Sequence, residues 1–163
     1  MRLPDVLAPL CYLDAMPVTN PDWEERRATV PKHILSAAIV VEDDDGQVLL
    51  VRGARRGWEM PGGQMEEGES PWEAAAREAQ EESGVAVEVT AFCGLSYTAE
   101  HSVCNLLFRG RSRGGTATAQ PAETLDAAFF PRGEALALVN YRNFRERIEM
   151  SLDPSSHGFF LIA

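Results

Sequence analysis

The segment from Gly63 to Val85 reads GQMEEGESPWEAAAREAQEESGV, and the interpretation of the whole chain starts from it. It contains seven glutamates and one arginine, which gives it a net charge of −6 out of the chain's −10. Like charges at this density repel one another, so the segment needs either full exposure to water or a positively charged partner. These two alternatives frame what the stretch can do.

The middle of this stretch carries the start and stop signals of one α-helix. Ser70-Pro71-Trp72-Glu73 is a capping box with proline at the first helical position, and Gly84 is placed to end the helix. We therefore expect a helix from Pro71 to Ser83. At about 100° per residue, an apolar set gathers on one side and an acidic set on another. The apolar set is Trp72, Ala75, Ala76 and Ala79, and the acidic set is Glu78, Glu81 and Glu82.

The acidic side of this helix has two interpretations. Two carboxylates about 5 Å apart repel by roughly 3 kcal/mol at an effective dielectric of about 20, so a divalent cation would turn that repulsion into binding energy. Oxygen ligands favour Mg²⁺, or Mn²⁺, over zinc, and Mg²⁺ is often shared with a substrate phosphate. The alternative is a solvated acidic helix face, which fits the helix pattern equally well.

The spacing of the residues favours the metal interpretation. Gly63, five residues, Glu69, seven residues and then Arg77-Glu78-Ala79-Gln80-Glu81-Glu82-Ser83-Gly84-Val85 resembles the Nudix box, the signature of the Nudix hydrolases. Trp58-Glu59-Met60-Pro61-Gly62-Gly63 in front of it resembles the family's usual lead-in. Ala79 departs from the pattern, because the family prefers a larger aliphatic residue there. The resemblance implies an α+β fold, the Nudix α/β/α sandwich with a mixed β-sheet in a single domain.

The resemblance also implies roles for individual residues. The implied metal ligands are Glu78, Glu81, Glu82 and the carbonyl oxygen of Gly62. Arg77 would hold the glutamates in place, because a guanidinium donates two parallel hydrogen bonds to a carboxylate. The general base would be Glu78 or a glutamate on a late loop, for which Glu123 is the candidate. For Glu123, ordinary surface charge is the alternative.

A short loop ahead of the box is the candidate substrate-binding segment. Arg52, Arg55 and Arg56 lie there, with glycines between them, and could hold substrate phosphates. Solubilising surface charge is the alternative for all three. Trp58 could stack on a base or ribose-linked ring, or could simply pack at the edge of a strand.

The rest of the chain predicts several strands and two further helices. Residues 1–30 carry four prolines and no sustained periodicity, which indicates an irregular arm in front of a domain over residues 31–163. The arm could cover the ligand pocket, contact a partner subunit or pack on the sheet. The expected strands are His33–Glu42 and Gln47–Arg52, joined by an Asp-Gly turn, then Val85–Gly94, Val103–Arg109 and Asp126–Phe130. The expected helices are Arg132–Leu138 and Tyr141–Met150, and residues 110–119 are expected to form a flexible loop.

The composition of the whole chain limits the kinds of partner that it can bind. A length of 163 residues with 45% hydrophobic content fits one domain. The most apolar run, Ile34 to Val41, is too short to cross a bilayer, so we expect no membrane span and a cytoplasmic protein. A sequence pI of about 4.7 argues against a large nucleic-acid surface. The expected partner is a small nucleotide diphosphate, and homodimer formation is left open.

Together these observations lead to one functional expectation and one alternative. The resemblance implies an Mg²⁺-dependent hydrolase, with Mn²⁺ as a second option, that cleaves a phosphoanhydride bond in a nucleoside diphosphate linked to another group. The substrate would be a nucleoside triphosphate, deoxy or not, or an ADP-sugar such as ADP-ribose. The alternative is a catalytically silent nucleotide-binding or regulatory module of the same fold.

Overall fold

The structure is a computed structural model that describes residues 28–153, 155, 156 and 158–162. The chain divides into two compact units, residues 1–32 and residues 33–163, and the second unit is described below. The arm predicted over residues 1–30 lies outside the described residues except for its last three positions. No helix among the described residues has both the length and the apolar character needed to cross a bilayer.

A mixed sheet of eight strands forms the centre of the described part of the chain. The strands run in the order β3-β2-β1-β6-β5-β8, while β4 pairs with β1 and β7 pairs with β2. The β1–β6 and β5–β8 pairs are parallel and the other pairs are antiparallel. The strands are β1 (Ile34–Glu42), β2 (Val48–Gly53), β3 (Gly57–Glu59), β4 (Gly62–Gln64), β5 (Ala86–Thr98), β6 (Val103–Gly114), β7 (Asp126–Phe130) and β8 (Phe159–Ile162).

The predicted hairpin between β1 and β2 is confirmed at its turn. Glu42 pairs with Val48, and Gly46 adopts the left-handed φ of 73° that favours glycine. The carboxylate of Asp43 accepts hydrogen bonds from the N–H groups of Asp45 and Gln47, which closes the turn. Beyond the turn the two strands separate, because β1 pairs with β6 and β4 while β2 pairs with β3 and β7. The turn therefore starts two different parts of the sheet.

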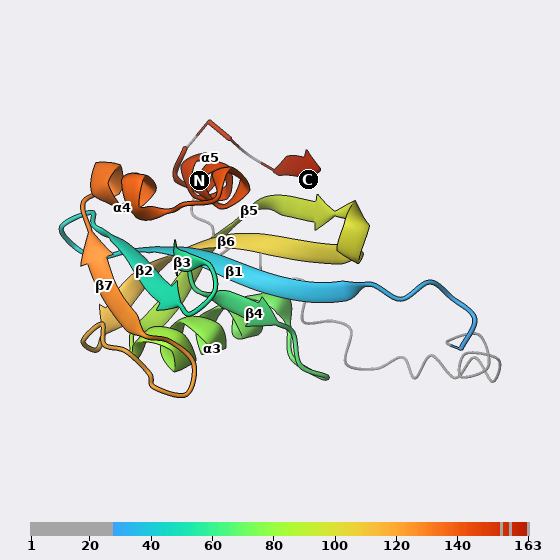
Figure 1. The fold of residues 1–163 in the computed structure, drawn as a ribbon, viewed down its shortest axis with the longest axis horizontal. Helices are drawn as coiled ribbons and strands as arrows, with labels where there is room; N and C mark the ends of the chain where they lie inside the picture. Colours follow the sequence, from blue (N-terminus) through green and yellow to red (C-terminus); the bar gives the residue numbers. More distant parts are fainter. Residues whose placement is uncertain (1–27, 154, 157, 163) are drawn as a thin grey trace. The chain divides into compact units, whose positions relative to one another are not determined.

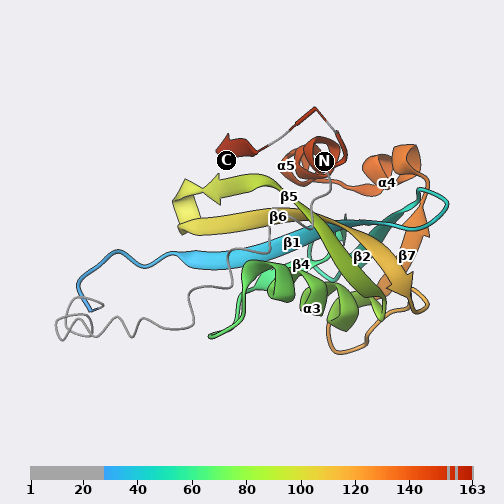
Figure 2. The same cartoon turned by 180° about the vertical axis from the view of Figure 1, so that it is seen from behind.

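Helices cover both faces of the sheet, as Figures 1 and 2 show from opposite sides. On one face lies α3 (Pro71–Ser83), and on the other lie α4 (Arg132–Leu138) and α5 (Arg142–Leu152). Successive residues of β1 supply both cores: Ala37, Ile39 and Val41 pack on the α3 side, and Ala38 and Val40 on the α4–α5 side. This is an α/β/α sandwich of the α+β class, as predicted.

The helix α3 has the predicted bounds, but its buried side differs from the prediction. The backbone N–H of Ser70 donates to Glu73 Oε2 at 2.9 Å, and Gly84 ends the helix with a φ of 76°. Trp72 is 53% exposed, so its assignment to the packed side was wrong. The buried residues of the helix are Ala74, Ala75, Ala79 and Ser83. Because this buried arc spans the positions of Glu78 and Glu82, these two acids lie on the packed half of the helix rather than opposite it.

The predicted flexible loop over residues 110–119 is wrong in its first half. Strand β6 continues to Gly114, and β5 extends beyond the predicted Gly94 as far as Thr98. The pairs Glu88–Arg111 and Ala86–Gly114 continue the ladder between them. Side chains of opposite charge support the extension, since Arg113 and Glu88 form an ion pair across the two strands.

Candidate active site

Two glycines bring strand β4 against the acidic part of α3. A side chain at Gly62 would place its Cβ 2.6 Å from the Ala37 carbonyl oxygen and from Ala38 Cβ, and a Cβ at Gly63 would collide with the carboxylate of Glu78. The backbone N–H of Gly62 donates a hydrogen bond to Glu82 Oε2 at 2.9 Å. The Gly-Gly pair therefore lets the backbone approach both carboxylates directly.

Arg77 ties together three glutamates of the box. Its Nε and one terminal nitrogen donate to the two carboxylate oxygens of Glu69 at 3.0 and 2.8 Å. The other terminal nitrogen donates to Glu78 Oε1 and Glu81 Oε2, each at 2.9 Å. The hydrogen bond to Glu69 is the main cause of a raised pKa at Arg77. Arg77 thus contacts three glutamates of the box, and its predicted role in holding them for a cation stays a prediction.

The ionisation of Glu82 and Glu78 is disfavoured by their surroundings. The pKa of Glu82 is raised to about 7. Burial is the largest cause, and the charges of Glu78, Glu59 and Glu123 also raise the pKa, whereas the hydrogen bond from the Gly62 N–H lowers it. Burial also raises the pKa of Glu78, although Arg77 acts in the opposite direction. The site therefore holds more negative charge than its own cations compensate.

A cavity of about 210 Å³ opens beside Glu82. Its acidic and cationic side chains come from three separate segments: the loop between β2 and β3 with the end of β3, the last turn of α3, and the segment before β7. The segment before β7 is anchored by Thr124, whose hydroxyl donates to the main-chain oxygen of Glu82 at 2.7 Å. The lining residues are Val51, Gly53, Ala54, Arg55, Arg56, Glu59, Glu82, Glu123 and Thr124.

The structure brings some of the predicted site residues together and separates others. Arg55 and Arg56 lie on the cavity wall with Glu82 and Glu123. The other predicted ligands lie close by along α3: Arg77 donates hydrogen bonds to Glu78 and Glu81. The backbone N–H of Gly62 donates to Glu82.

Arg52 and Trp58 are not part of the cavity wall. Arg52 forms an ion pair with Asp126 at 3.6 Å, and its guanidinium carbon lies 5.7 Å from the centre of the Trp58 ring. Trp58 packs edge-on against Phe130, with 5.0 Å between the centres of the two rings. The contacts of Trp58 are therefore those expected of a residue that packs at the edge of a strand. A substrate contact by Arg52 or Trp58 stays a prediction.

Two polar side chains of this cavity, Glu59 and Thr124, were not among the predicted site residues. Glu59 is only 8% exposed, on a short strand, and its carboxylate accepts a hydrogen bond from Arg56 Nε at 2.7 Å. A single acidic residue between Trp58 and Met60, which are apolar, was a usable signal for a buried, partnered carboxylate. Thr124 has no comparable signal, because its role depends on a contact between residues 42 positions apart.

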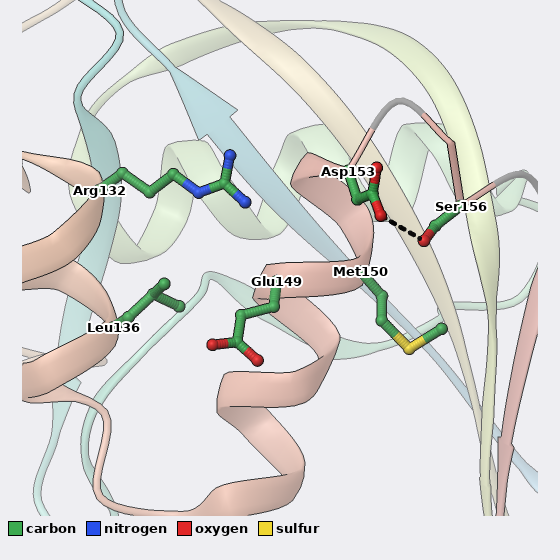
Figure 3. A pocket seen from close by; sticks show the side chains of 6 residues that line it. All are labelled: Arg132, Leu136, Glu149, Met150, Asp153 and Ser156. Atoms are coloured by element: carbon green, nitrogen blue, oxygen red, sulfur yellow. Dashed lines mark hydrogen bonds between the residues drawn. The ribbon is translucent and has the colours of Figure 1, made fainter.

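A second, larger hollow of about 370 Å³ lies between α4 and α5 (Figure 3). Arg132 and Leu136 line it from α4, Glu149 and Met150 from α5, and Asp153 and Ser156 from the segment after α5. The carboxylate of Asp153 already accepts a hydrogen bond from Ser156 at 3.2 Å. None of the predicted site residues borders this hollow. The smaller cavity beside Glu82 is therefore the candidate site, because it gathers the uncompensated carboxylates.

The donor set at the smaller cavity fits a hard divalent cation. In the part of the chain that the structure describes, no three histidine, cysteine, aspartate or glutamate side chains form a ready-made metal cluster. Glu78 and Glu81 are instead turned toward Arg77. A closed zinc cage needs about four such ligands, whereas Mg²⁺ binds through one or two carboxylates plus water and phosphate oxygens. Glu82, which lines the cavity, and Glu78, one turn earlier on α3, are partly buried and crowded by other charges, and they match the second arrangement.

Comparison with known proteins places this geometry in a family. The NUDIX domain model matches residues 32–150. A MutT-like protein of Streptomyces ambofaciens is 41% identical over 86 residues, which are 52% of this chain and 56% of that protein. The human 8-oxo-dGDP phosphatase NUDT18 is 32% identical over 126 residues, which are 73% of this chain and 38% of that protein. The chain thus spans less than two thirds of the length of these curated relatives.

Solved structures show the same fold. The crystal structure of a NUDIX hydrolase from Nitrosomonas europaea superposes with a TM-score of 0.72 at 22% sequence identity. The superposition covers 82% of this chain and 80% of that chain. Since the domain model covers most of the sequence and the box, the sheet and the helices agree with it, this chain belongs to the Nudix family.

Proposed function

We propose that this protein is a divalent-cation-dependent hydrolase that cleaves a phosphoanhydride bond in a nucleoside diphosphate derivative. The observation that carries the proposal is the convergence of Glu82, Glu123, Arg55 and Arg56 on one cavity of about 210 Å³. Carboxylates that bind a cation and guanidiniums that bind phosphate are the two groups that a metal–pyrophosphate complex requires. The name 8-oxo-dGDP phosphatase of one relative supports a nucleotide substrate.

The cation would be held by the C-terminal half of α3 and by strand β4. Nudix hydrolases generally use divalent metal ions, and the oxygen donors here favour Mg²⁺, with Mn²⁺ as the second choice. Glu78 and Glu82 would be the principal ligands, with Glu81 and the carbonyl of Gly62 as further oxygen donors. When bound, such an ion neutralises phosphate charge and lowers the pKa of a coordinated water.

The chain's own residues would orient the reacting groups and take up the proton. In the reaction a water oxygen bonds to phosphorus, the bond from that phosphorus to the bridging oxygen breaks, and the leaving phosphate keeps the bridging oxygen. Arg55 and Arg56 would hold the phosphates, and Arg77 would keep Glu78 and Glu81 in place. Glu78 and Glu123 are the two candidates for the carboxylate that accepts the water proton.

The size of the cavity bears on the substrate. Its volume of about 210 Å³ is below the roughly 300–1,000 Å³ of sites that enclose a whole drug-sized ligand. We therefore assign the cavity to the phosphates and the cation and place the nucleoside outside it. Both substrate classes predicted from the sequence, a nucleoside triphosphate and an ADP-sugar such as ADP-ribose, are compatible with this division.

A substrate screen tests the proposal. The purified full chain is incubated with nucleoside triphosphates, nucleoside diphosphates and ADP-sugars, with Mg²⁺, with Mn²⁺ or with a chelator, and the release of phosphate, pyrophosphate and monophosphate is measured. We expect turnover of at least one class that is abolished by the chelator. Tight nucleotide binding without turnover would instead support the silent regulatory module, and turnover that is equal in the chelator would overturn the metal assignment.

A further inference from the structure

Resting on the function proposed above, we propose that Glu59 and Phe144 are positioning residues for Arg56, which they hold so that the terminal edge of its guanidinium binds a substrate phosphate. Neither residue belongs to the box, and they come from different layers of the sandwich: Glu59 ends β3, and Phe144 lies in the first turn of α5. The layer formed by α4 and α5 thereby takes part in substrate binding.

The first contact fixes one edge of the Arg56 guanidinium. Arg56 Nε donates to Glu59 Oε2 at 2.7 Å, and within the described residues this is the only hydrogen bond of the Arg56 side chain. Glu59 keeps only 11% of its side chain exposed, while Arg56 keeps 46%. Glu59 accepts a hydrogen bond from Nε alone, so the two terminal nitrogens of Arg56 remain for a ligand. These two nitrogens can donate a bidentate pair of hydrogen bonds to a phosphate.

The second contact supports the flat face of the same guanidinium. The Arg56 guanidinium carbon lies 5.5 Å from the centre of the Phe144 ring. Arg147, which is 5% exposed, places its own guanidinium carbon 4.8 Å from the same centre and donates from Nε to Ser96 Oγ at 3.2 Å. The Phe144 ring thus contacts the buried Arg147 side chain of its own helix. Cation–π attraction orients the Arg56 guanidinium over the same ring.

The neighbouring Arg55 shows what an unsupported arginine in the same wall looks like. Arg55 lines the cavity, yet in the described part of the chain it has neither an ion pair nor a ring contact. Ordering a free arginine side chain on binding costs conformational entropy that a pre-positioned one has already lost. We therefore expect Arg56 to contribute more to phosphate affinity than Arg55.

Because Glu59 is charged, the direction in which Glu59→Gln changes phosphate affinity distinguishes a positioning role from a purely electrostatic one. A carboxylate on the wall of a cavity repels a polyanion, so a Glu59 that acted only through its charge would weaken phosphate binding. Its neutralisation would then tighten binding. If Glu59 instead holds Arg56, Glu59→Gln weakens binding, because the charge-assisted hydrogen bond to Nε is replaced by a weaker neutral one.

The experiment measures the dissociation constant of inorganic pyrophosphate in the presence of Mg²⁺ by calorimetry. The wild-type full chain is compared with Glu59→Gln, Arg56→Ala, Arg55→Ala and the two double variants that add Glu59→Gln to each alanine variant. Glu59→Gln is expected to raise the dissociation constant about 3- to 10-fold in the wild-type background. In an Arg56→Ala background, Glu59→Gln is expected to leave the dissociation constant unaltered or to lower it. In an Arg55→Ala background, the matched control, the wild-type rise is expected to persist.

Phe144 supplies a second pair of variants in case Glu59→Gln disturbs folding. Phe144→Leu removes the ring and is expected to raise the dissociation constant about threefold, whereas Phe144→Tyr keeps the ring and is expected to stay within about twofold of wild type. A fall in the dissociation constant for Glu59→Gln, or the same factor with and without Arg56, overturns the proposal. Pyrophosphate binding without hydrolysis of any nucleotide would refute the proposed function alone, and no pyrophosphate binding by the wild type would refute both.

Discussion

Arg77 and Glu69 form a two-point ion pair, with Nε to Oε2 at 3.0 Å and a terminal nitrogen to Oε1 at 2.8 Å. The pair joins the loop before α3 to the middle of the helix, and the same terminal nitrogen of Arg77 donates to the Gln64 carbonyl at 3.0 Å. Arg77 therefore fastens strand β4, the loop and the helix at one point. Its geometry depends on the planar fork of a guanidinium, which an ammonium group lacks.

From this pair we predict that Arg77→Lys and Arg77→Ala both lower the melting temperature, by about 3–8 °C for alanine and less for lysine. The reason is that lysine keeps the charge but makes fewer simultaneous hydrogen bonds. Arg142→Ala is the control, because Arg142 forms an exposed pair with Glu146 one turn along α5. Equal melting temperatures for the wild type and Arg77→Lys would show that the fork geometry contributes nothing.

The metal-free protein should lose stability as the pH rises from about 4.5 to about 7. The pKa of Glu82 in the folded state is about 7, whereas its ordinary value is about 4.5, so in this window the folded state retains a proton that the unfolded state has released. The loss amounts to about 3 kcal/mol, fully developed above pH 7. In the presence of a chelator we expect Glu82→Gln, which cannot titrate, to be more stable than the wild type at pH 8.

Chemical denaturation at pH 5 and pH 8 measures this effect. Glu134→Gln, an exposed position on α4, is the matched control and should follow the wild type. Added Mg²⁺ should restore much of the lost stability at pH 8, since the ion binds the deprotonated carboxylate. A wild type whose stability with chelator is the same at both pH values, or rises in parallel with the Glu82→Gln variant, would contradict the assigned pKa.

The two glycines of strand β4, Gly62 and Gly63, should respond differently to alanine. At Gly62 the new Cβ would meet the Ala37 carbonyl oxygen and the Ala38 side chain, both belonging to β1, so Gly62→Ala should lower the free energy of unfolding by about 1–3 kcal/mol. At Gly63 the new Cβ would meet only the movable carboxylate of Glu78. Gly63→Ala should therefore keep the fold but lower kcat at least tenfold. Wild-type kcat in Gly63→Ala would show that the position of Glu78 is not critical.

Thr124 should matter for the site although it carries no charge. Its hydroxyl donates to the Glu82 carbonyl at 2.7 Å and thereby fixes the segment that carries Glu123. Thr124→Val keeps the shape and leaves that carbonyl without this donor, at a cost of about 1–3 kcal/mol. We expect a lower melting temperature together with a fall in kcat, and Thr124→Ser should restore both. If the serine variant behaves like the valine variant, the hydroxyl is not the reason.

Local sequence signals predicted most of the secondary structure. The capping box and Gly84 gave α3 its observed bounds, and α4 was also predicted residue for residue over Arg132–Leu138. These signals act over a few residues, so they can be read without knowing the partners. The strand ends were less certain, because β6 extends to Gly114 only by pairing with β5.

For the candidate site, the sequence carries a signal in the box but none for packing between distant segments. The glutamates and Arg77 follow a spacing in one stretch of sequence. The exposure of Trp72 and the partial burial of Glu78 on the same helix depend on where the sheet lies, which helical periodicity alone cannot show. Likewise, the partnership of Glu59 with Arg56 joins a strand to a loop, and the support from Phe144 comes from another layer.

The most direct test of the account is the kcat of Glu82→Gln with Mg²⁺ and the best substrate from the screen. The substitution removes the charge of the carboxylate that lies in the cavity and accepts the Gly62 N–H, while it keeps the side chain's shape. We predict a fall in kcat of at least about a thousandfold, roughly 4 kcal/mol of transition-state stabilisation, with an unchanged fold. Undiminished Mg²⁺-dependent turnover in this variant would contradict the claim that Glu82 holds the catalytic cation.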